Sequence, residues 1–231
     1  MSGTGSATSP RVRNRRGEGA RLRDDIVAAA VELLDEHGDE SAITLRSVAR
    51  QVGISAPSIY RHFPDQPAIM LAVVQQAYTE LNERLLSAVD AAGSDPRRRL
   101  FAIGTAYLEV AEQHPQRYRT MFGGVWVPAL GESSVTADDL FALGETALQL
   151  LARTLEECVE AGYATSNDLF ADTVAVWLGL HGLAHQRSVT AAFPWPADIA
   201  ERMITALAHL VPEGTEAADG KLTAEGTPLT A

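Results

Sequence analysis

Residues 44–63 read TLRSVARQVGISAPSIYRHF, and they carry two helix-start signals on either side of a glycine. Thr44 stands in the cap position of a first short helix, and Gly53 stands where that helix must end. Ser55 stands in the cap position of a second helix, expected over residues 56–62, with a proline tolerated in its first turn. Two short helices joined by a tight turn predict a helix-turn-helix unit.

The apolar positions of this stretch predict a small core with a polar face turned outward. Five side chains have the spacing to bury together: Val48, Ala49, Val52, Ile54 and Ile59. The second helix then presents a face without an acidic side chain, made of Ala56, Ser58, Tyr60, Arg61 and His62. Such a face suits contact with DNA phosphates. The alternative is an ordinary helical hairpin at the end of a bundle.

The charge of the chain is divided unevenly. The 231 residues carry a net charge of −11, which by itself argues against nucleic-acid binding. Residues 1–23 nevertheless carry +5 and residues 41–63 carry +3, whereas residues 64–231 carry −12. This asymmetry favours a small DNA-facing module on an acidic body, and a solvated basic tail is the alternative.

The rest of the chain has helical periodicity and no strand pattern, so an all-α fold is expected. Helices are predicted over residues 22–37, 66–92, 95–114, 136–162, 166–192 and 197–210, with a further short one ending near residue 122. Residues 123–135 are rich in glycine and proline and are expected to form a loop. The composition after residue 212 predicts a disordered tail.

Three segments carry a resemblance to a known family. They are IVAAA at residues 26–30, ITLRSVA at 43–49 and VGISAPSIYRHF at 52–63, and they closely resemble the DNA-binding domain of TetR-family transcriptional regulators. The Tyr-x-His-Phe ending is the most specific element. Gln66 is a departure, because members often carry lysine there.

The resemblance implies roles for individual residues. Phosphate contacts fall to Thr44, Ser55, Tyr60 and His62, base-edge contacts to Ala56, Pro57, Ser58 and Arg61, and Arg46 completes the DNA-binding set. It also implies domains: a disordered basic arm over 1–18, the helix-turn-helix domain over 19–65 and a helical ligand-binding and dimerisation domain over 66–211, followed by the tail over 212–231. The helices of residues 166–192 and 197–210 are expected to pair with those of a second copy.

A second resemblance concerns residues 177–182, WLGLHG, which are similar to the Trp-His-Gly signature of one TetR C-terminal subgroup. Trp177 and His181 share a helical face, so contact with an effector and plain core packing both remain open. His181 and His185 have metal-ligand spacing, but a hydrogen-bonded pair is the favoured interpretation and no metal or cofactor is expected. The predicted effector-binding residues are Tyr107, Met121, Phe122, Trp126, Phe141, Trp177 and His181.

The cysteine content and the hydropathy of the sequence exclude several classes of protein. The single cysteine, Cys158, excludes an internal disulfide and a cysteine-based zinc site. No stretch has the length of a membrane helix or a signal-peptide core, so a cytoplasmic protein is expected. The resulting hypothesis is a dimeric regulator, expected to be a repressor, that binds double-stranded DNA and a small apolar effector. The alternative is a helical enzyme or small-molecule-binding protein that retains the N-terminal fold.

Overall fold

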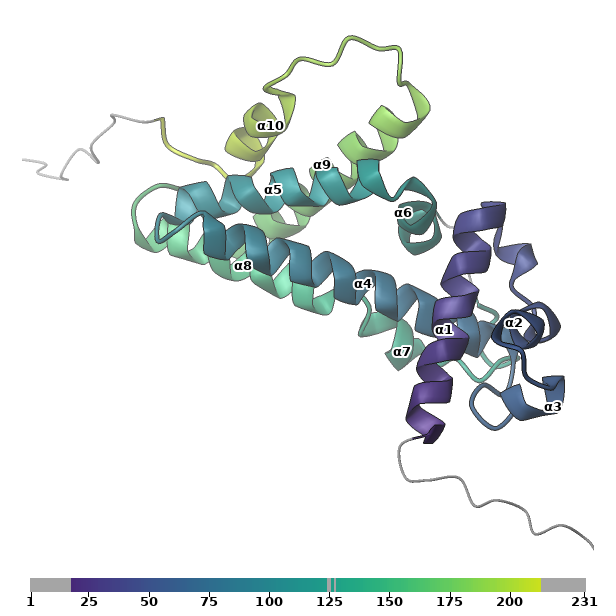
Figure 1. Ribbon diagram of the computed structural model, residues 1–231. Helices are drawn as coiled ribbons and strands as arrows, with labels where there is room; N and C mark the ends of the chain where they lie inside the picture. The colour runs from purple at the N-terminus through teal and green to yellow at the C-terminus, as the bar shows by residue number, and fades with distance from the viewer. Residues whose placement is uncertain (1–17, 124–125, 127, 213–231) are drawn as a thin grey trace, which may run out of the picture. The chain divides into compact units, whose positions relative to one another are not determined.

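The computed structural model describes residues 18–123, 126 and 128–212, and Figure 1 shows its helices in chain order. The described residues form helices joined by turns and loops, without a strand, and one isolated antiparallel bridge joins Ala164 to Leu210. The all-α fold is therefore confirmed. Residues 1–17 of the predicted arm and 213–231 of the predicted tail lie outside the described residues.

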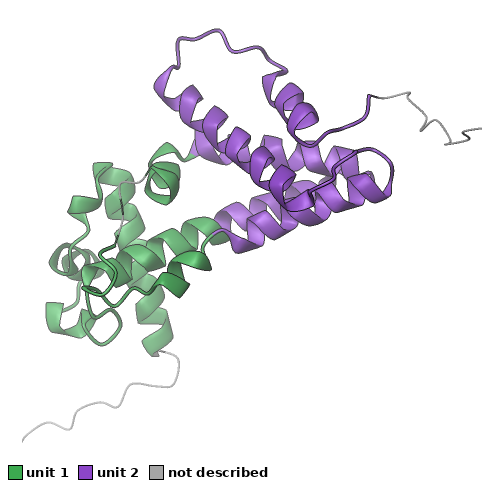
Figure 2. Ribbon diagram, turned by 180° about the vertical axis from the view of Figure 1, so that it is seen from behind, with its two compact units in different colours: residues 1–79, 114–143 green, residues 80–113, 144–231 purple. Residues whose placement is uncertain are grey.

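The chain divides into two compact units, coloured in Figure 2. The first consists of residues 1–79 and 114–143 and contains α1 (Glu18–His37), η1 (Glu40–Ala42), α2 (Leu45–Val52), α3 (Ala56–Ile59), α6 (Pro115–Phe122) and α7 (Ala137–Phe141). The second consists of residues 80–113 and 144–231 and contains α5 (Pro96–Gln113), α8 (Glu145–Glu160), α9 (Leu169–Val189) and α10 (Ile199–Leu207). Helix α4 (Gln66–Ala91) contributes to both. The domain boundary expected after residue 65 coincides with the start of α4. The two compact units instead meet within that helix, between residues 79 and 80.

The helix-turn-helix core forms as its apolar spacing predicts. Val48, Ala49 and Ile59 are at most 2% exposed, and Val52 and Ile54 pack partly buried at the edge of the same cluster. Side chains from α1 and from the first turns of α4 complete this core. Burying an aliphatic side chain of this size stabilises a fold by about 1.5–3 kcal/mol. The core therefore holds the short helices α2 and α3, which are too short to be stable alone.

Most predicted helix ends differ from the structure by a few residues, and two differences change the path of the chain. The second helix of the motif was expected over residues 56–62, but α3 ends at Ile59 and the chain continues in a turn. Pro64 disfavours helical geometry at Phe63, so the helix cannot continue through the end of the motif. The single helix expected over residues 136–162 is two helices, α7 and α8. Gly144 separates them because its φ of 77° lies in the left-handed region.

The second unit is a set of closely packed helices. Helix α5 packs against α8 and α9, and α10 packs against α9 and α5. A Cβ on Gly179 would lie 2.7 Å from Leu207 Cδ1, so glycine lets α10 approach α9 of the same chain. The helix that Gly179 accommodates is thus one of the chain's own. No helix among the described residues is long and apolar enough to cross a lipid bilayer.

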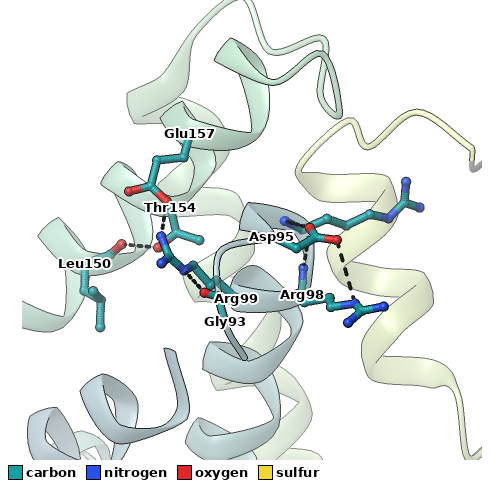
Figure 3. Close-up of polar contacts among 8 residues, drawn as sticks. Gly93, Asp95, Arg98, Arg99, Leu150, Thr154 and Glu157 are labelled. Atoms are coloured by element: carbon teal, nitrogen blue, oxygen red, sulfur yellow. Dashed lines mark hydrogen bonds and ion pairs between the residues drawn. The ribbon is translucent and has the colours of Figure 1, made fainter. Parts of the chain in front are cut away.

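Arginines at the start of α5 connect it to its surroundings (Figure 3). Asp95 Oδ1 accepts hydrogen bonds from the backbone N–H groups of Arg97 and Arg98 and so caps the helix. Arg99 donates from Nε to the Gly93 carbonyl at 2.6 Å and from Nη1 to Glu157 of α8 at 3.0 Å. The Arg98 guanidinium forms a loose ion pair with Asp95, at 3.7 Å, and its side chain is 78% exposed. Arg98 is thus solvated, whereas Arg99 is anchored to the preceding turn and to α8.

This difference gives a first stability prediction. Arg99→Ala should lower the free energy of unfolding by about 1 kcal/mol, because it removes a hydrogen bond to a carbonyl and a half-buried ion pair. Arg98→Ala removes the same charge from an exposed position and should stay within about 0.5 kcal/mol of the wild type. Urea unfolding of the two variants measures this, and equal losses would contradict the assignment.

Candidate nucleic-acid interface

The first turn of α2 is held by a reciprocal cap. Ser47 N–H donates to Thr44 Oγ1 at 3.0 Å, and Thr44 N–H donates to Ser47 Oγ at 2.9 Å. Ser47 Oγ also donates to the Ala42 carbonyl at 2.6 Å, which ties the cap to η1. The predicted N-cap role of Thr44 is confirmed. Thr44 and Arg46 are both exposed on this fixed turn.

The turn between α2 and α3 depends on glycine for its conformation. Gly53 has φ 76°, which other residues rarely adopt, and its N–H bonds back to the end of α2. Ser55 was expected to cap α3, but its side chain makes no cap hydrogen bond to the backbone. Instead, the hydroxyl groups of Ser55 and Ser58 lie 2.8 Å apart and hydrogen-bond to each other. Both are hydroxyl groups on the predicted DNA-facing side.

The predicted DNA contacts lie at or near the surface of one continuous segment. Thr44, Arg46, Ser55, Pro57, Tyr60 and Arg61 are exposed, and Ala56, Ser58 and His62 are partly buried. Tyr60 is 57% exposed, an unusual position for a large aromatic side chain. Residues 41–63 contain three arginines and no acidic residue. The segment thus presents hydroxyl groups, a phenol and cations without a carboxylate of its own, as a phosphate backbone requires.

The carboxylate of Asp65, which follows this segment in the chain, hydrogen-bonds to a loop that is distant in sequence. Asp65 Oδ1 accepts a hydrogen bond from Ala68 N–H at 2.9 Å and so caps α4. Ser134 lies 69 residues away and donates to Asp65 twice, from its N–H at 2.8 Å and from its hydroxyl at 3.0 Å. Burial alone would raise the pKa of Asp65, but the hydrogen bonds from Ser134 and Ala68 outweigh it, and the pKa is lowered.

Asp65→Ala should therefore lower the free energy of unfolding by about 1–2 kcal/mol at pH 7. Because the folded-state pKa is lowered, this stabilisation is fully present above the unfolded-state pKa of about 3.9. It is lost as the pH falls through the lower folded-state value. Urea unfolding at pH 7 and pH 3 measures the effect, and the gap between variant and wild type should narrow at pH 3.

Neighbouring serines provide the control for this link. Ser133 Oγ donates to the Ala129 carbonyl at 3.2 Å and accepts a hydrogen bond from Val135 N–H at 3.4 Å, both within its own loop. Ser134→Ala should destabilise the protein more than Ser133→Ala, since only Ser134 reaches Asp65. Equal effects would mean that the link to α4 contributes nothing measurable.

The predicted effector-binding residues fall in both units. Met121, Phe122, Trp126 and Phe141 belong to the first unit, and Tyr107, Trp177 and His181 belong to the second. In the first unit, the Phe122 ring lies 5.0 Å from that of Tyr118, Met121 is partly exposed, and Phe141 is 82% exposed. Trp126 packs against the helix-turn-helix core.

The three candidates of the second unit contact one another. Tyr107 on α5 is 5% exposed, and its hydroxyl lies 3.2 Å from His181 Nδ1 on α9. The Trp177 ring stacks on His181 with 5.8 Å between ring centroids. Burial, with a further contribution from His185, lowers the pKa of His181, so the neutral imidazole is favoured at pH 7. This trio joins a polar hydrogen-bonded pair to a large apolar surface.

Sequence reasoning missed the partners that come from distant segments. Ser134 carries no local signal for its bond to Asp65, because a serine in a loop is common and the contact spans 69 residues. Cys158 is a poor nucleophile, because it is fully buried, and this burial, together with nearby carboxylates, raises the pKa of its thiol to about 12.

Two family models match the chain. The one described as bacterial regulatory proteins, tetR family, matches residues 26–73, and the one described as tetracyclin repressor-like, C-terminal domain, matches residues 100–210. The first range contains the whole helix-turn-helix unit. The second begins within α5 and extends past the end of α10.

Individual relatives are more distant. The nucleoid occlusion factor SlmA of Vibrio cholerae is 27% identical over 131 residues, which cover 57% of this chain and 66% of that protein. The HTH-type transcriptional activator FasR of Mycolicibacterium smegmatis is 31% identical over 119 residues, covering 49% and 52%. The chain thus spans less than two thirds of the length of either curated relative. A solved structure of a Rhodococcus protein of unknown function is 26% identical, with a TM-score of 0.66, covering 81% of this chain and 91% of that one.

Proposed function

Since the chain belongs to the TetR family of bacterial regulatory proteins, we propose that it binds a palindromic operator as a homodimer and represses transcription until a small, largely apolar effector releases it. Family membership makes it a DNA-binding transcriptional regulator and not an enzyme. The observation that carries the operator proposal is the exposed, acid-free segment from Thr44 to His62, held on a rigid core.

The shortness of α3 supports a two-fold symmetric site. A helix of four residues with the turn after it reaches only a few base pairs, so useful specificity requires two half-sites separated by about one or more helical turns. Nuclease footprinting on the protein's own promoter region tests this. Two symmetric protected half-sites are the expected result, and one unpaired half-site bound by a monomer would contradict it.

Repression depends on where the operator lies relative to the promoter. A repressor's operator overlaps the promoter, and deletion of the gene should then raise transcription of the regulated genes. The relative FasR is named an activator. A fall in transcription on deletion would mean that this chain activates transcription, and it would overturn the repressor proposal.

An exposed apolar stripe on α9 supports dimerisation. Phe170 is 74% exposed, Leu178 53% and Val189 60%, and these positions follow one side of the helix. Gly182 lies on the same side, and a Cβ built there would meet nothing within 4 Å. Exposed apolar side chains beside a glycine gap suit the close approach of another helix. We infer that a second copy covers it.

Effector recognition is assigned to the Tyr107, Trp177 and His181 trio. The neutral His181 and the Tyr107 hydroxyl offer a hydrogen-bonding end, and the Trp177 ring offers apolar surface, which is the composition of a typical small-molecule site. Effector binding there releases DNA if it favours a dimer conformation in which the helix-turn-helix domains of the two protomers no longer match the half-sites.

Tyr107→Phe should therefore impair the effector response and leave operator affinity unchanged. Loss of one hydrogen bond in a buried site is worth about 1–2 kcal/mol, so the half-maximal effector concentration should rise about 5- to 30-fold. Apolar small molecules are first screened for release of labelled operator, and the best one is then titrated against each variant. Tyr163→Phe, which removes a hydroxyl from a 39% exposed tyrosine, is the matched control. Equal responses of the two variants would exclude Tyr107 from the site.

A further inference from the structure

Arg23 on α1 is held over an aromatic ring next to the predicted DNA-binding segment. Its guanidinium carbon lies 4.9 Å from the centroid of the Phe63 ring, within the range of a cation–π interaction. Phe63 is 2% exposed, so the ring is a fixed part of the core, whereas Arg23 is exposed. The cation is therefore held beside a rigid aromatic surface while the Arg23 side chain remains exposed to solvent.

The position of Phe63 places this cation beside the end of α3. Phe63 N–H donates to the Ile59 carbonyl at 2.9 Å, and His62 N–H donates to the same carbonyl at 2.8 Å. The ring is thus fixed by its own backbone to the turn that carries Tyr60 and His62. Arg23 comes from a segment 40 residues earlier, and the Phe63 ring brings the two together.

A contact with an aromatic ring leaves the N–H donors of a guanidinium available. These donors lie in the plane of the group and are directed along its edge. Those donors match two oxygens of a phosphate in a bidentate arrangement. An aromatic partner holds the cation in place without neutralising its charge, unlike a carboxylate. Stacking also restricts the side-chain rotamers before binding, which lowers the entropic cost of the contact.

We propose that Arg23 is a pre-positioned phosphate contact, binding the DNA backbone beside the bases reached by α3. The inference rests on the proposed operator binding and adds a residue of α1 to the interface. It predicts one additional neutralised phosphate per bound protomer, contributed from outside the helix-turn-helix segment. The phosphate contact depends on both the charge of Arg23 and its stacking on Phe63.

The salt dependence of operator binding tests the charge. Affinity of the full chain for labelled operator is measured by fluorescence anisotropy between 50 and 300 mM KCl. Each phosphate neutralised contributes about 0.9 to the slope of log K against log salt concentration. Arg23→Gln should lower the slope by about 0.9 per bound protomer. Arg23→Lys should keep the slope and still weaken binding several-fold, because an ammonium group lacks the planar fork.

Arg21 supplies a matched control on the same helix. It is exposed and two residues earlier, so it lies about 200° around α1 from Arg23. Arg21→Gln removes the same charge at nearly the same height and should change the slope by much less. An unchanged slope for Arg23→Gln, or an equal change for both variants, would overturn the inference. Failure of the wild-type chain to prefer operator over random DNA would instead reject the proposed function.

Discussion

Leu178→Glu is expected to give a monomer that keeps its helices and loses about 100-fold or more in operator affinity. Leu178 is 53% exposed in the middle of the apolar stripe on α9, so a carboxylate there does not disturb the core of the second unit. In a dimer, however, the charge is buried against the second copy without a partner. Two linked DNA-binding units bind about 10²–10⁴-fold more tightly than one, and a monomer loses this gain.

Burial distinguishes Leu178 from the other leucines of α9, whereas the apolar pattern of the sequence does not. Leu180 has the same residue type two positions later and is 2% exposed, so Leu180→Glu is expected to unfold the second unit. Leu86 on α4 is 43% exposed and away from α9 in sequence, which makes Leu86→Glu the matched control. Sedimentation velocity gives the oligomeric state and anisotropy the affinity. A Leu178→Glu protein that sediments as a dimer would place the interface elsewhere.

Truncation of Tyr60 is expected to lower overall DNA affinity, whereas truncation of Arg61 is expected to change base preference. Tyr60→Ala should weaken binding about 10-fold to every sequence, because a phosphate contact carries no base information. Arg61→Ala should relax the preference at one position of each half-site, since a bidentate arginine–guanine pair is worth about 1–3 kcal/mol of discrimination. Selection from a randomised operator library measures both affinity and base preference for each variant.

Two further variants separate these roles from general effects. Tyr60→Phe keeps the ring and removes only the hydroxyl, so it should reproduce most of the Tyr60→Ala loss. Arg50→Ala removes an exposed charge from the last turn of α2 and should leave the base preference unchanged. Loss of base preference in both arginine variants would mean that Arg61 acts through charge alone.

Much of the first unit was predictable because its signals act within about four residues. Thr44 caps α2 through a serine three positions away, and Gly53 supplies the positive φ that ends that helix. The spacing of Val48 and Ile59 predicts the core they share. The end of α3 was misplaced by three residues, and the break at Gly144 was missed. A glycine inside a helical pattern does not indicate by itself whether the helix continues or ends there.

Local signals were enough to predict the all-α class, the helix-turn-helix motif and its family, because caps, glycine turns and apolar periodicity are local properties of the chain. The tertiary structure was needed to establish that Ser134 binds Asp65, that Phe63 holds Arg23 and that Leu178 is exposed while Leu180 is buried. It also decided that the predicted effector-binding residues divide between two units. These outcomes depend on which distant segments pack together, and packing is set by the shape and volume of many side chains at once.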